Sequence, residues 1–114
     1  MIVEQFLVEG LGHASHLLID DRTGFAAVID PRRDIDLYLQ AAQERNVHIT
    51  HVLETHDHND FVSGSRELAA ATGAHIVAGA DAGLPFAYQD LRDGELIELG
   101  SIAILAIATP SHPP

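Results

Sequence analysis

Short apolar stretches alternate with helix-like segments along the chain, and this alternation predicts a mixture of strands and helices. The run 20–24 (DDRTG) is typical of a turn, so the apolar stretches on either side of it predict a β-hairpin. Pro31 is expected to end that hairpin, because proline cannot continue the hydrogen bonding of a sheet. Segment 79–93 is expected to be irregular. The predicted strands are 2–8, 16–19, 25–29, 47–55, 74–78, 95–99 and 102–108.

Two helices are predicted between these strands. The first has Asp34 as its N-cap and ends at Asn46, and its apolar residues recur at the spacing of one helix face. The second begins at Ser63 or Ser65, both good capping residues, and ends at Gly73, which suits the left-handed conformation after a helix. The apolar stripe of the first helix consists of Ile35, Tyr38, Leu39 and Ala42.

The run 102–108 (IAILAIA) is apolar at every position. A strand that is apolar on both sides must be covered on both faces of its sheet. The two predicted helices can cover one face of the sheet. The chain has few remaining residues that could form a layer over the other face. The pattern therefore predicts a sheet with one face that needs further structure.

Composition excludes several classes of function. The 114 residues suit one domain at most. The chain has six arginines, no lysine and 17 acidic residues, so its net charge is −11. This charge argues against binding to nucleic acid or anionic membranes, because phosphate contacts need clustered positive charge. No apolar run approaches the roughly 20 residues of a membrane-spanning helix.

Missing residue types narrow the chemistry further. The chain has no cysteine, which excludes a disulfide framework and a thiol nucleophile, and it has no lysine for a Schiff base. A metal site would have to use histidine and carboxylate ligands. The first residues (MIVEQFLVEG) have no basic segment before their apolar stretch, so we expect no secretory signal and a cytoplasmic protein.

Segment 54–60 (ETHDHND) contains the strongest candidate chemistry. It follows an apolar strand and precedes a predicted helix cap. Alternate residues of an extended backbone project to one side, so His56, His58 and Asp60 converge at the end of a buried strand. Two imidazoles and a carboxylate on one side form a site for a divalent metal. The alternative is a polar loop with coincidental histidines, which the interleaved acids and the regular spacing disfavour.

His112 is a second candidate metal ligand. It lies in the segment 109–112 (TPSH), which follows the apolar run 102–108. Strand ends are places where a rigid sheet presents ligands on loops. A histidine two residues from the end of the chain fits an unordered terminus equally well, and the residues alone leave both interpretations open.

The remaining polar residues of the strand-like segments have simpler interpretations. Asp30 lies between a predicted strand and a proline. There it either shapes the turn or contacts a histidine that binds the metal, without binding the metal itself. His48, His51 and His75 lie on strand-like stretches, and we expect them to be structural.

Together these motifs resemble the metallo-β-lactamase superfamily, and in particular its persulfide dioxygenases, which are often fused to rhodanese domains. The resemblance extends from 12–15 (GHAS) through 29–31 (IDP) and 54–68 (ETHDHNDFVSGSREL) to 109–112 (TPSH). It implies an α+β fold: the amino-terminal αβ half of the four-layer αββα sandwich of that superfamily. Residues 1–114 would then form a partial metallo-β-lactamase-like domain.

The resemblance also implies roles for the candidate ligands. His56 and His112 match the two histidines that hold the single iron of the dioxygenases, whose third ligand, an aspartate, would lie beyond the last residue here. His58 and Asp60 match positions that bind zinc in the dinuclear hydrolases of the superfamily. No catalytic residue is assigned beyond these ligands.

Two positions depart from the superfamily pattern. Phe61 stands where the dinuclear hydrolases have a histidine, and because a phenyl ring cannot bind a metal, this residue disfavours a second ion and a hydrolase. Ser111 stands where the superfamily usually has glycine, which is tolerable only if that position does not need a positive φ.

Three functions follow as hypotheses from the resemblance. The first is Fe(II)-dependent oxidation of a glutathione-type persulfide, and the second is zinc-dependent hydrolysis of a thioester or lactone, as in glyoxalase II. The third is an inactive half-domain that dimerises or binds metal weakly. A lone half would expose a large apolar patch, so we expect a chain whose carboxy-terminal half is missing, or a homodimer that replaces that half.

Overall fold

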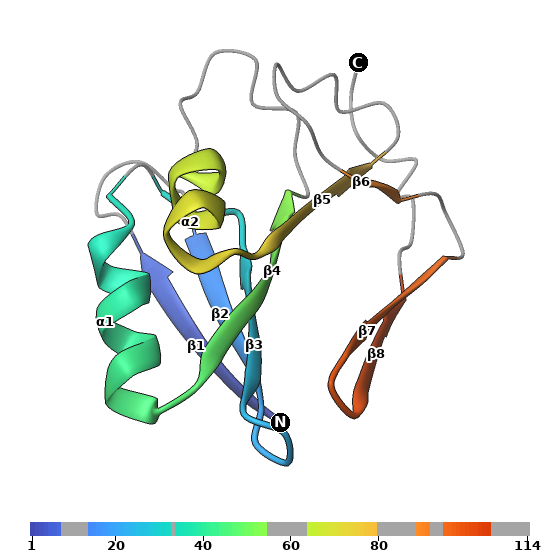
Figure 1. Ribbon diagram of the computed structural model, residues 1–114, viewed down its shortest axis with the longest axis horizontal. Helices are drawn as coiled ribbons and strands as arrows, with labels where there is room; N and C mark the ends of the chain where they lie inside the picture. The colour runs from blue at the N-terminus through green and yellow to red at the C-terminus, as the bar shows by residue number, and fades with distance from the viewer. Residues whose placement is uncertain (8–13, 33, 55–63, 80–88, 92–94, 106–114) are drawn as a thin grey trace.

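The computed structural model describes residues 1–7, 14–32, 34–54, 64–79, 89–91 and 95–105. In these residues two helices cover one face of a six-stranded sheet, and a β-hairpin lies on the opposite face (Figure 1). The strands of the large sheet are β1 (Ile2–Leu7), β2 (Ala14–Asp20), β3 (Phe25–Ile29), β4 (His48–Glu54), β5 (His75–Gly79) and β6 (Gln89–Leu91). The helices are α1 (Asp36–Arg45) and α2 (Ser65–Thr72), and the hairpin consists of β7 (Leu96–Leu99) and β8 (Ile102–Leu105).

The large sheet follows the order of the chain, β1-β2-β3-β4-β5-β6. The pairs β1–β2 and β2–β3 are antiparallel, whereas β3–β4, β4–β5 and β5–β6 are parallel. Parallel neighbours need a crossover, and α1 and α2 supply the first two. As a result β3, β4, β5 and β6 all end at the same edge of the sheet.

Each face of the sheet carries its own apolar cluster. The cluster on the helix side surrounds the fully buried Tyr38, whose ring meets that of Phe6 edge-on with centroids 5.2 Å apart. The cluster on the other side joins the sheet to the β7–β8 hairpin through Ile97 and Leu99. The sheet residues of this second cluster are Leu18, Ala27, Leu53 and Val77.

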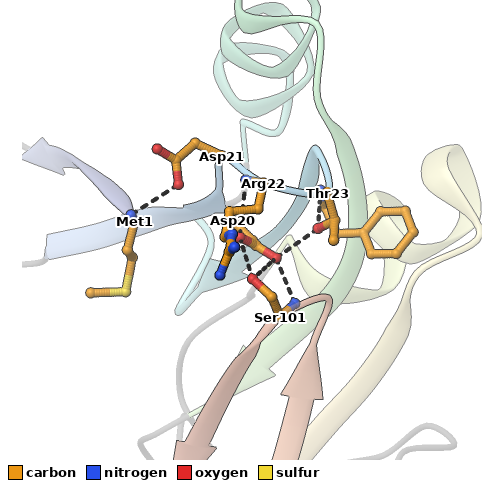
Figure 2. Close-up of polar contacts among 7 residues, drawn as sticks. Met1, Asp20, Asp21, Arg22, Thr23 and Ser101 are labelled. Atoms are coloured by element: carbon orange, nitrogen blue, oxygen red, sulfur yellow. Dashed lines mark hydrogen bonds and ion pairs between the residues drawn. The ribbon is translucent and has the colours of Figure 1, made fainter.

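A single carboxylate fastens the hairpin to the large sheet (Figure 2). Asp20, at the end of β2, accepts hydrogen bonds from the Ser101 amide at 2.6 Å, the Thr23 hydroxyl at 2.7 Å and the Arg22 amide at 3.1 Å. The Ser101 hydroxyl donates to it as well, at 2.8 Å. These donors, led by the Ser101 amide, hold the pKa of Asp20 well below its usual range.

The predicted helix ends are confirmed, and the predicted start of the first helix is wrong. Asn46 and Gly73 end α1 and α2 in the left-handed conformation, with φ of 54° and 76°. The N-cap of α1 is Ile35 rather than Asp34, and no side chain caps it. The Asp34 carboxylate still accepts from the Asp36 amide at 3.3 Å, so it helps the first turn from one position further out.

The second helix and the late strands also differ in detail. The N-cap of α2 is Gly64, so Ser65 lies inside the helix, and Ser63 falls outside the described residues. Segment 79–93 was expected to be irregular, but Gln89–Leu91 pairs with β5, and its polar, very short sequence carries no strand signal. In the described part of 102–108, Ala103 is exposed and β8 pairs with β7 rather than joining the large sheet, so the predicted burial on both faces is wrong there.

Among the described residues, neither helix is long and apolar enough to cross a membrane.

Candidate metal centre

Three of the four predicted metal ligands belong to a segment that begins at the edge where the parallel strands end. Segment 55–63, which contains His56, His58 and Asp60, directly follows β4 and directly precedes the start of α2. These three residues and His112 lie outside the described residues, so their convergence stays a prediction. Within the described ranges, no group of three or more histidines and carboxylates could hold a metal ion.

Asp30 lies at this edge, immediately after β3. It is buried and adopts a φ of 53°, an unusual conformation for a residue with a side chain. Its amide donates to the carbonyl oxygen of Leu53 at 2.7 Å, which ties the end of β3 to the end of β4. Asp30 therefore shapes the turn, as expected. Its contact to a ligand histidine stays a prediction.

Glu54 and Ser65 connect the two sides of the candidate segment. Glu54 is the last residue of β4 and Ser65 is the first of α2, and both are buried. The Ser65 hydroxyl donates a hydrogen bond to Glu54 Oε1. The end of β4 and the start of α2 are therefore held together, although segment 55–63 separates them in the sequence.

Gly64 holds the start of α2 against the turn after β3. Its amide donates to the carbonyl oxygen of Pro31 at 3.4 Å, and its own carbonyl accepts from Leu68 at 2.8 Å in the first turn of the helix. A β-carbon at position 64 would overlap the carbonyl oxygen of Arg32 and the side chain of Ile35. Only glycine allows the two segments to approach this closely.

A buried tyrosine supports the same turn from the helix side. The Tyr38 hydroxyl accepts from the Arg32 amide at 2.6 Å and shares a hydrogen bond with the Ser15 hydroxyl, also at 2.6 Å. Burial raises the pKa of Tyr38, so the group stays a neutral phenol and can act as donor and acceptor at once.

Sequence reasoning missed three of these supporting residues. The predicted apolar stripe correctly includes Tyr38, because its ring belongs to the helix-side cluster. The pattern does not indicate that its hydroxyl forms hydrogen bonds. Ser15 falls just before the predicted strand 16–19, whereas in the structure it lies inside β2. Glu54 carried a usable signal, because a charged residue at the end of the apolar run Val52-Leu53 has to find a polar partner once it is buried.

The described surroundings fit a cation. Two buried carboxylate residues, Asp30 and Glu54, lie at the edge of the sheet that segment 55–63 follows in the sequence. Neutral imidazoles and carboxylates suit both Fe(II) and Zn(II), so this donor set is compatible with either ion. Those ligands would come from His56, His58, Asp60 and His112.

Comparison with known proteins gives a family match and several related proteins. Residues 9–114 match the family described as the metallo-beta-lactamase superfamily. The chain is 39% identical over 98 residues to a hydroxyacylglutathione hydrolase of Cereibacter sphaeroides, a match that covers 84% of this chain and 38% of the relative. The corresponding enzyme of Rhodospirillum rubrum is 38% identical over 92 residues, covering 79% of this chain and 36% of the relative. The chain thus spans well under half the length of these relatives.

Several solved structures are also similar to this chain. A metallo-beta-lactamase from Staphylococcus aureus superposes with a TM-score of 0.88 at 34% identity, covering 100% of this chain and 36% of that one. ETHE1 from Myxococcus xanthus superposes with a TM-score of 0.83 at 30% identity, covering 90% of this chain and 46% of that one.

Proposed function

Because the chain belongs to the metallo-beta-lactamase superfamily, we propose that it contributes metal ligands to an enzyme acting on a glutathione-derived thiol compound. The reaction we favour is iron-dependent oxidation of a glutathione persulfide. The relatives named hydroxyacylglutathione hydrolase support the glutathione part of this proposal. The observation that carries the choice of reaction is Phe61, which removes a ligand that a dinuclear hydrolase needs.

In this proposal His56 and His112 would hold one Fe(II) ion, with a carboxylate as the third ligand. The iron, when bound, would supply the redox chemistry that oxidation of a persulfide by dioxygen needs. His58 and Asp60 lie beside this centre. Residues 1–114 would form a partial domain of the superfamily fold.

The described residues would orient these ligands. The Ser65–Glu54 hydrogen bond and the contact of Gly64 with Pro31 hold both ends of segment 55–63 against the sheet edge. A ligand displaced by about 1 Å can lose most of its function, so ends held in this way favour a defined metal geometry. Asp30 is the candidate partner for the second ring nitrogen of a ligand histidine.

A second candidate is zinc-dependent hydrolysis of a glutathione thioester, which the named relatives favour directly. Here His58 and Asp60 would bind a second ion, and Phe61 counts against it. The third, a half-domain without activity, would show neither reaction and little bound metal.

Metal analysis and two assays separate these candidates. We expect the protein, purified as its gene encodes it and without added metal, to contain about one iron per chain and to consume dioxygen when given glutathione persulfide. His56→Ala should lose both the iron and the oxygen uptake. Two zinc ions per chain together with hydrolysis of S-lactoylglutathione would replace this proposal with the hydrolase.

The matched variant is Phe61→His, which restores the histidine of the dinuclear hydrolases. We expect it to increase the bound zinc per chain and to raise any thioester hydrolysis without improving oxygen uptake. Unchanged zinc content in this variant would mean that Phe61 does not decide between the two reactions.

A further inference from the structure

Two histidines meet on the face of the sheet opposite the helices. His51 of β4 and His75 of β5 are register partners on adjacent parallel strands, and their ring centroids are 6.0 Å apart with planes inclined by 49°. Each precedes by two positions a residue of the hairpin-side cluster, Leu53 or Val77, so both side chains project to that face. His51 is half-buried and His75 is exposed.

A bulge in β4 aims His51 toward that face. Ala26 and Ala27 of β3 pair with Ile49 and His51, which leaves Thr50 as an extra residue in β4. Bulges are rare in parallel pairs, and they commonly redirect a side chain near a functional site.

A hydrogen bond holds the His51 ring in place. The Thr50 hydroxyl lies 2.8 Å from His51 Nδ1 and 3.3 Å from the carbonyl oxygen of Ala26. When the hydroxyl donates to that carbonyl, it accepts a hydrogen bond from the ring Nδ1–H. In this tautomer the lone pair is on Nε2, as in metal-binding histidines whose other nitrogen is held by an acceptor. Burial, and next the charge of His75, lower the pKa of His51, which keeps it in the neutral form that binds metals.

We propose that His51 and His75 together bind a divalent transition-metal ion such as Zn²⁺ or Ni²⁺, with water completing its coordination. An imidazole nitrogen lies about 2.0–2.1 Å from such an ion, which places two ring centres roughly 5 Å apart at a tetrahedral angle. The observed 6.0 Å would close to this distance by a small rotation of the exposed His75 side chain. His51 precedes Glu54 by three residues, or about 10 Å of strand, so this site is separate from the proposed centre at the sheet edge.

The test uses the full chain with His56→Gln, His58→Gln, Asp60→Asn and His112→Gln, which remove the four candidate ligands of the proposed centre. Zn²⁺ is titrated while the imidazole ¹⁵N signals are followed by NMR, and affinity is measured by calorimetry. We expect His51 Nε2 and a nitrogen of His75 to shift together and to saturate at one ion per chain. His75→Gln, at an exposed position, should weaken binding about tenfold or more.

His48→Gln is the matched control, because His48 is exposed in the same strand and pairs with Phe25 rather than with a histidine. It should leave the affinity unchanged. Thr50→Val, which removes the acceptor of the Nδ1 hydrogen, should weaken binding about 10-fold. The proposal is overturned if the two rings do not respond to Zn²⁺, or if His48→Gln weakens binding as much as His75→Gln. Loss of metal from the sheet edge alone would bear only on the proposed function.

Discussion

At the scale of single residues, the edge of the sheet depends on two residues with unusual steric or backbone requirements. Gly64 leaves room for the carbonyl of Arg32, and Asp30 adopts a positive φ to bring its amide to Leu53. Neither requirement follows from hydrophobic periodicity. The first arises because the start of α2 lies close to the turn after β3, and the second because the end of β3 is tied to the end of β4.

Gly64→Ala tests this close approach. The added methyl group overlaps backbone and cannot be relieved by a side-chain rotation, so we expect a loss of about 1–3 kcal/mol in the free energy of unfolding. Urea denaturation followed by circular dichroism measures the loss.

Gly73→Ala is the comparison, since a β-carbon there meets open space and only the left-handed conformation opposes it. That strain costs about 1–2 kcal/mol. The distinguishing result is weaker metal binding in Gly64→Ala alone. Equal metal affinities in the two variants would show that Gly64 does not position the candidate segment.

At the scale of elements, hydrogen bonds between buried side chains hold separate elements together. Tyr38 of α1 reaches Ser15 of β2 and the turn after β3, and Ser65 of α2 reaches Glu54 of β4. The helix stripe and the strand patterns predicted these elements and their faces. They could not predict the pairs, because the partners are brought together only when the helices pack on the sheet.

Tyr38→Phe keeps the ring and removes the hydroxyl. The Arg32 amide and the Ser15 hydroxyl then lose a partner in the interior, and we expect a loss of about 1–3 kcal/mol in the free energy of unfolding. Ser15→Ala should cost less, because Tyr38 keeps its bond with the Arg32 amide. A Tyr38→Phe variant as stable as the parent would show that the hydroxyl contributes nothing measurable.

At the scale of the whole molecule, two sheets of different size meet through one apolar cluster and one carboxylate. Ile97 and Leu99 cover part of the face opposite the helices, and Asp20 fastens the turn of the same hairpin. Gly100 adopts a φ of 59°, and a β-carbon there would overlap the side chains of Asp20 and Thr23. The predicted missing half or homodimer would cover the rest of this face. Sedimentation of the purified chain would test the dimer.

The Asp20 contact predicts how stability depends on pH. The folded state holds the pKa of Asp20 below its ordinary value of 3.8, so its contribution is complete above that value. As the pH falls below about 4, the unfolded chain binds the proton first and stability is lost progressively. Urea denaturation from pH 6 to pH 3 measures this loss.

Asp20→Asn should be less stable than the parent at pH 6 and should show a weaker decline toward pH 3. Glu44→Gln, at an exposed position of α1, is the control and should keep the parent's decline. An Asp20→Asn variant with the same pH dependence as the parent would contradict a role for this carboxylate in fastening the hairpin.

Local patterns in the sequence were enough to predict both helices, the helix ends at Asn46 and Gly73, and membership of the superfamily. They also predicted, in approximate position, seven of the eight strands found in the described residues. These depend on local periodicity, turn residues and motifs, which neighbours in the chain carry. Four features came from the packing of the folded chain instead: the cap at Gly64, strand β6, the hydrogen bond between Ser65 and Glu54, and the pairing of His51 with His75. Each of these joins segments distant in sequence, and such contacts form only when packing and desolvation choose the partners.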